Sequence, residues 1–163
     1  MSLDIVGAAV LHYRDNSRRW IDVRHFIFPE PATDQDLLAR LIASRQFRNG
    51  YMGGPDWADP NPIHGPYRLE TISPDCYRLI DSSEAAAWLD DFCSLFQAPA
   101  HPALAADIES VVRRRLREAD SVFQLPELDD AQHDTGWVLH EFRELVLIRR
   151  NLAELSLVVM GID

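Results

Sequence analysis

The sequence predicts an α+β fold, in which a mainly antiparallel sheet has about three helices packed on it. Three observations lead to this prediction. Apolar, β-branched segments joined by turn residues lie near both chain ends, amphipathic helix patterns occupy the middle, and the last two apolar segments are almost continuous. With 163 residues, 47% of them hydrophobic, the chain is long enough to bury its own core. We therefore expect residues 1–163 to form a single domain.

Residues 4–28 predict two strands joined by a tight turn. The first strand is rich in apolar and β-branched residues, and the turn residues Asp-Asn-Ser follow it. The second alternates, and Pro-Glu-Pro at 29–31 ends it. Such a hairpin can bring His25 close to His12 across the turn. We interpret both as ordinary histidines rather than as a catalytic dyad.

Three helices are predicted between the strand regions. The first covers 33–47, with Thr33 as its N-cap and Gly50 as its C-terminal cap. The second covers 82–96, and the third covers 102–119 with a proline in its first turn. Each of these segments has apolar residues at the spacing of one helix face.

The remaining segments predict strands and one polar connector. Residues 67–73 and 76–81 indicate short strands around a Pro-Asp turn. Residues 126–136 form an acidic connector, and 137–150 and 152–163 predict two long strands. Because these last strands are almost continuously apolar, we expect them to be central strands, or strands with a face covered by helices.

The charge balance restricts the function. The net charge is −10, and all sixteen basic residues are arginine. Without lysine the chain has neither a Schiff-base residue nor a phosphate-loop lysine. Because phosphate neutralisation supplies most nucleic-acid affinity, we expect no nucleic-acid partner. An acidic domain suits a basic protein partner instead, since complementary fields steer association.

The sequence pattern predicts neither a membrane span nor a signal peptide. No apolar run approaches the roughly 20 residues that cross a bilayer. The apolar N-terminal segment has Asp4 where a signal peptide has basic residues, and no small-residue cleavage site follows. We therefore expect a cytoplasmic protein with no membrane partner.

Residues 49–66, "NGYMGGPDWADPNPIHGP", are unusually rich in glycine and proline. Glycine permits unusual backbone angles and proline stiffens the chain, so such a loop is preorganised for recognition. Tyr51 and Trp57 are residue types that anchor interfaces. A purely structural loop with its aromatic side chains packed inside is the main alternative.

A metal or catalytic site in this loop is a further alternative. Asp56, Asp59 and His64 have ligand chemistry, but no second histidine or cysteine lies nearby. Cys76 and Cys93 lack zinc or redox spacing and are expected to be free thiols. We therefore expect no cofactor and no metal.

Two other motifs are given structural interpretations. Asp134-Thr135-Gly136 spells the aspartic-protease triplet, but no buried strand precedes it and only one copy is present. The basic stripe at 113–118 is flanked by acids, so we expect ion pairs within the helix rather than a phosphate site.

Two acidic sets extend the predicted binding surface. Asp90 and Asp91 belong to "WLDDF", and the connector contains "ELDDAQHD". Solvated helix and loop faces would also account for these acids. The predicted partner-binding residues are Tyr51, Asp56, Trp57, Asp59, Asp90, Asp91, Glu127, Asp129 and Asp130.

In size, acidity and lack of a catalytic motif, the chain resembles bacterial toxin-immunity proteins. This resemblance implies a non-enzymatic module that neutralises a basic toxin, such as a nuclease, by direct binding. One alternative is an enzyme or metal-binding protein with a site assembled around the 49–66 loop. Another is a regulatory subunit that forms a homodimer through an exposed terminal hairpin.

Overall fold

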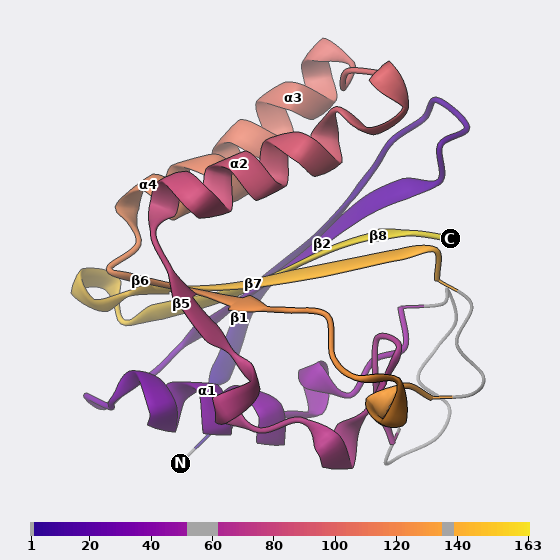
Figure 1. The fold of residues 1–163 in the computed structure, drawn as a ribbon. Coiled ribbons are helices and arrows are strands. Elements are labelled where there is room, and N and C mark those ends of the chain that lie inside the picture. Colours follow the sequence, from indigo (N-terminus) through magenta and orange to yellow (C-terminus); the bar gives the residue numbers. More distant parts are fainter. Residues whose placement is uncertain (1, 52–61, 135–138) are drawn as a thin grey trace.

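The structure is a computed structural model that describes residues 2–51, 62–134 and 139–163. Its main sheet has six strands in the order β1-β2-β8-β7-β6-β5, with antiparallel neighbours throughout (Figure 1). The strands are β1 (Asp4–His12), β2 (Arg19–Ile27), β5 (Arg78–Ile80), β6 (Ser121–Leu125), β7 (Glu141–Arg149) and β8 (Glu154–Ile162). A small second sheet pairs β3 (Ile63–His64) with β4 (Tyr67–Arg68).

Helices cover both faces of the main sheet, which confirms the predicted α+β class. They are α1 (Asp34–Ala43), α2 (Ser82–Cys93), α3 (Pro102–Ile108) and α4 (Arg114–Glu118). A π-helical segment, Glu109–Arg113, makes α3 and α4 one continuous rod, as the third predicted helix requires. Short 3-10 helices span Arg45–Phe47, Leu69–Thr71, Pro74–Cys76, Leu95–Gln97, Asp130–Gln132 and Arg150–Leu152. No helix among the described residues is long and apolar enough to span a bilayer.

The terminal hairpin lies at the centre of the fold. β8 pairs with β2 on one side and with β7 on the other, so neither terminal strand is a sheet edge. The prediction that both faces of these strands are covered is confirmed, because α1 lies on one face and α2–α4 lie on the other (Figure 1). The alternative that this hairpin is an exposed self-association surface is wrong.

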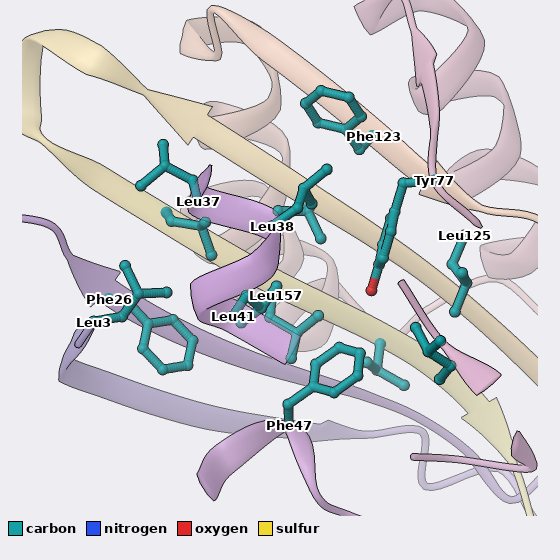
Figure 2. Close-up of a cluster of buried hydrophobic side chains, with 14 of the residues drawn as sticks. Leu3, Phe26, Leu37, Leu38, Leu41, Phe47, Tyr77, Phe123, Leu125 and Leu157 are labelled. Carbon is teal, nitrogen blue, oxygen red and sulfur yellow. The ribbon is translucent and has the colours of Figure 1, made fainter. Parts of the chain in front are cut away.

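The core has one cluster on each sheet face. On the α1 face, helix leucines pack over the sheet together with Phe47 and Tyr77 (Figure 2). On the other face, Leu89 and Phe92 of α2 and Val112 and Leu116 of the α3–α4 rod are buried. Burying apolar area at about 25 cal/mol per Å² is the main stabilising contribution to such layers.

The start of α1 follows its sequence pattern, whereas its end differs. Thr33 caps the helix, since its side chain accepts a hydrogen bond of 3.1 Å from the Asp36 amide. The α-helix ends at Ala43, because Ser44 has an extended backbone, and a 3-10 turn follows. The prediction that Gly50 caps this helix is therefore wrong.

The sheet pairing settles three local points. Residues 67–73 contribute only the two-residue strand β4 before a 3-10 turn. β6 was not predicted from its five residues, since a segment this short becomes a strand through its pairing with β5 and β7. The two histidines of the first hairpin do not pair, because His12 lies opposite Trp20 and His25 lies opposite Gly7.

Candidate functional site

The described ends of the 49–66 loop are held together at their base. The Gly65 amide donates a hydrogen bond of 2.7 Å to the Asn49 carbonyl. Tyr51 is only 8% exposed, and its ring stacks on Trp20 with 5.5 Å between centroids. Tyr51 is thus part of the core in this structure, and its predicted role in binding stays a prediction. Asp56, Trp57 and Asp59 lie outside the described residues.

A buried polar cluster lies directly beneath this base. His64 and Glu144 form an ion pair or hydrogen bond between Nε2 and Oε2, and both side chains are fully buried. The Tyr77 hydroxyl donates to the other carboxylate oxygen of Glu144 at 2.5 Å. His64 also stacks on Phe47, with centroids 3.5 Å apart and planes within 5°.

The hydrogen-bond partners fix most of the protons in this cluster. A carbonyl only accepts, so His64 Nδ1, which lies 2.5 Å from the Phe47 carbonyl oxygen, is the donor in that contact. His64 Nε2 therefore makes its own contact with Glu144 Oε2. Burial raises the pKa of Tyr77 well above its usual value, and the Glu144 charge raises it further. Tyr77 therefore stays protonated and donates.

This geometry argues against His64 as a metal ligand. Both ring nitrogens of His64 are engaged by protein groups, so His64 offers no lone pair to a metal in this structure. Among the described ranges, no three His, Cys, Asp or Glu side chains gather as a metal site requires. Cys76 and Cys93 are free and partly buried, as expected.

The sequence pattern contained one signal of the buried cluster. β7 begins with the half-buried Glu141, and its one other acid, Glu144, is fully buried among apolar residues and arginines. A lone carboxyl in a central strand requires partners, since an unpaired buried charge is very costly. Its partners lie far along the chain, and therefore no local spacing identified them.

A pocket of about 600 Å³ opens between α2, β7 and the connector after β6. Trp88 and Phe142 supply aromatic surface, and Arg78, Arg143 and Glu127 supply charge. The pocket also includes His133 and His140. An aromatic wall with a few convergent charges is typical of a recognition site.

The charges of this pocket are held in place by ion pairs. Arg143 contacts Asp91 at 2.9 Å and Glu141 at 2.8 Å, and it donates to the Trp88 carbonyl at 3.0 Å. The guanidinium of Arg78 pairs with Glu84 at 2.6 Å. Glu127 adds a further acid to the lining. The lining itself holds two acids, Glu127 and Glu141, and two arginines. Glu84 and Asp91 pair with these arginines from outside the lining, so four acids surround two arginines.

The predicted acidic residues do not all converge. Asp91 reaches the pocket through Arg143, and Glu127 lines it. Asp90 is directed to Arg113 instead, at 2.6 Å, and borders a different pocket. Asp129 and Asp130 are exposed at the start of the 3-10 helix that follows Glu127 in the chain.

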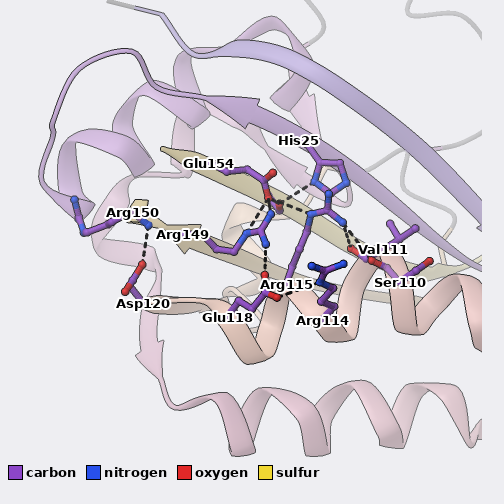
Figure 3. A network of polar contacts seen from close by, with 11 residues as sticks. His25, Ser110, Val111, Arg114, Arg115, Glu118, Asp120, Arg149, Arg150 and Glu154 are labelled. Carbon is purple, nitrogen blue, oxygen red and sulfur yellow. Dashed lines mark hydrogen bonds and ion pairs between the residues drawn. The ribbon is translucent and has the colours of Figure 1, made fainter. Parts of the chain in front are cut away.

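The basic stripe at 113–118 is fully paired. Arg115 and Arg149 both contact Glu154, and Arg149 also reaches Glu118 (Figure 3). The other arginines of the stripe each contact an acid as well. The predicted ion pairs are present, two of them within the helical rod, whereas others join different elements. The expectation that no phosphate binds here stays a prediction. Of the Asp134-Thr135-Gly136 triplet, only Asp134 is described.

Comparisons with known proteins assign no family. No family model and no curated protein matches the chain. Among solved structures, two crystal forms of citrus MAF1 are similar, with TM-scores of 0.39 and 0.40, identities of 11% and 10%, and 93% of each chain covered. A likeness this distant carries no argument about function.

Proposed function

We propose that the protein is a binding module that neutralises a basic protein partner, such as a nuclease toxin, in the manner of an immunity protein. The pocket beside Trp88 carries this proposal. Two acids, Glu127 and Glu141, line the pocket. Its two arginines pair with Glu84, Asp91 and Glu141, so four acids surround two arginines. This local excess has the same sign as the net charge of −10.

The chemistry of the pocket fits an inserted arginine or lysine. A cation lies favourably over an indole ring, and Trp88 already has the Arg143 guanidinium 5.5 Å from its ring centroid. Glu127 is exposed and has no ion pair with a described residue, so its carboxylate can pair with a cationic side chain of the partner. The acidic field of the whole domain would speed the encounter and weaken with salt.

The experiment is affinity capture of the tagged protein from its source organism at low and high salt. Captured proteins are identified by mass spectrometry, and the affinity of the purified pair is then measured. We expect one stoichiometric basic protein whose binding weakens with salt. Glu127→Arg should weaken that binding at least about tenfold, since a cation then faces a cation.

Glu30→Arg is the matched control, because it makes the same charge change at an exposed position. Glu30 also lies far from the pocket along the sheet. It follows the end of β2, which pairs with the start of β8, whereas Glu141 of the pocket pairs with the end of β8. This control should bind nearly as well as the wild type. Capture of no basic partner at either salt, or equal losses in both variants, would contradict the proposal.

A further inference from the structure

Three arginines near the end of α1 form an exception to the ion pairing of this chain. Most arginines contact an acid, but no described acid forms an ion pair with Arg40, Arg45 or Arg48. The other two arginines without such a pair, Arg14 and Arg18, lie in the exposed connection between β1 and β2. Acids are abundant in a chain with a net charge of −10, so this basic segment requires an explanation.

Two of these arginines contain buried nitrogen atoms without an acceptor. Nη1 of Arg40 and Nε of Arg48 are both buried, and neither makes a hydrogen bond with a described group. A buried donor that is left unsatisfied is destabilising, and more so when it belongs to a charged group. An anion that approached these guanidinium groups would supply the missing acceptors and the missing charge.

A pocket of about 620 Å³ lies beside the C-terminal end of α1. Arg40 and Arg45 are the charged residues of its lining, and no acid belongs to that lining in the part of the chain that the structure describes. Ser2 and Gln46 add neutral hydrogen-bonding groups. The pocket shares no lining residue with the one beside Trp88. It is therefore a separate site of opposite charge.

The acids that are nearest along the chain are engaged or directed elsewhere. Asp36, one turn before Arg40, accepts a hydrogen bond of 2.8 Å from the Thr33 hydroxyl in the helix cap. The hydrogen bonds with Thr33 lower the pKa of Asp36, and Arg40 makes a smaller contribution in the same direction. Asp4 lies opposite Ile27, on the side of the sheet that α4 covers rather than α1. Neither acid neutralises the pocket.

We propose that this pocket binds the phosphate or carboxylate group of a small organic molecule, with Arg40 and Arg45 as the charged contacts. A guanidinium group matches both oxyanions, because its N–H donors can form two parallel hydrogen bonds with them. Leu3, Ala39 and Ala43 also line the pocket, so the bound molecule has a short apolar part. The pocket volume lies within the range of small-molecule sites.

The charge of the whole chain favours a small molecule over a polyanion. A nucleic acid brings many phosphates, and most of them would approach a surface with a net charge of −10. A single oxyanion needs only the local field of the two lining arginines, which acts over a few ångströms and is reinforced by Arg48 close by in the chain. The ligand is therefore a small molecule with one anionic group.

A titration followed by two-dimensional NMR of the backbone amides tests this site. The probes are phenyl phosphate, benzoate and inorganic phosphate, all at constant ionic strength. We expect amide shifts within residues 39–46 and a dissociation constant of about 1 mM or tighter for at least one aromatic probe. Inorganic phosphate should bind more weakly, since it has no apolar part to contact Leu3. Tighter binding of phenyl phosphate assigns a phosphate ligand, and tighter binding of benzoate assigns a carboxylate.

Substitutions at matched positions test the charged contacts. Arg45→Gln should weaken binding of the tighter probe at least about tenfold, because a charge-assisted contact is lost. Arg45 is exposed, so this variant should fold normally, and Arg40→Gln should weaken binding similarly. Arg18→Gln is the matched control, since Arg18 is also exposed and has no ion pair with a described acid. It should bind as the wild type does.

Two results would overturn the proposal. One is the absence of amide shifts within residues 39–46 with every probe at about 10 mM, where a site of the expected affinity is almost fully occupied. The other is an equal loss of binding in Arg45→Gln and Arg18→Gln, which would show that the probes respond to overall charge rather than to this pocket.

Discussion

His64 and Glu144 form a fully buried pair although 80 positions separate them in the chain. One stands in the short strand β3 at the base of the glycine- and proline-rich loop, and the other stands in the centre of the main sheet. The pair therefore ties the loop base to the core. Removing one partner would leave an uncompensated polar group in an apolar environment.

Glu144→Ala should lower the free energy of unfolding by about 3–5 kcal/mol, the range for breaking a buried pair. His64→Leu should have a similar effect. The double variant should be less destabilised than the sum of the two, because no unpaired charge remains. Urea denaturation measures all three. Glu127→Ala, at an exposed position, should change stability by only about 0.5 kcal/mol. Strict additivity of the two single effects would contradict the coupling.

Gly65→Ala should destabilise the protein by about 2–4 kcal/mol through overpacking and backbone strain. Gly65 has a φ of 52°, and an added methyl group would overlap the Phe142 ring. Thermal unfolding followed by circular dichroism checks this. Gly7→Ala is the control, because its methyl group would meet His25 at an ordinary 3.5 Å. Equal melting temperatures for both variants would show that the close approach to Phe142 is not limiting.

Arg19→Lys should be destabilising even though the charge is kept. The Arg19 guanidinium is buried and donates to the carbonyls of Phe92, Cys93 and Ala98 at 3.2, 2.7 and 2.7 Å. An ammonium group cannot span these acceptors, so buried carbonyls lose partners, at about 1–3 kcal/mol each. Guanidinium chloride denaturation measures the loss. Arg18→Lys, at an exposed position, should be neutral, and a neutral Arg19→Lys would show that the fork geometry is not needed.

His25 should make stability depend on pH. Burial lowers the pKa of His25, Arg115 and Arg149 lower it further, and Glu154 opposes them. Below the unfolded value of 6.5 the unfolded chain binds more protons, so stability falls as pH drops from 6.5 to the folded-state pKa. His25→Gln should reduce the loss of stability between about pH 7.5 and about pH 5.5.

Urea midpoints at the two pH values measure this difference. His140→Gln provides the comparison, since His140 is exposed. It should leave the pH dependence close to that of the wild type. An unchanged pH dependence in His25→Gln would show that the network of Figure 3 does not hold this imidazole neutral.

Most of the secondary structure could be predicted because its signals are local. Thr33 with Asp36 marks a helix start, the alternation of β2 marks a strand, and the unbroken apolar character of β8 marks a central strand. Each of these signals depends on residues that are close together in the sequence, within one or two helix turns or a single strand. The α+β class followed from their order along the chain.

Sequence alone thus determined most of the elements, the acidic charge and the absence of lysine. Only the tertiary structure decided that β1 rather than the terminal hairpin is an edge, and that Tyr51 is buried. It also decided that Glu127 lines one pocket, whose Arg143 is paired with Asp91, while Asp90 borders another. The physical reason is that strand order and side-chain partners depend on which faces pack together. Packing joins residues such as His64 and Glu144 across distances that no local pattern records.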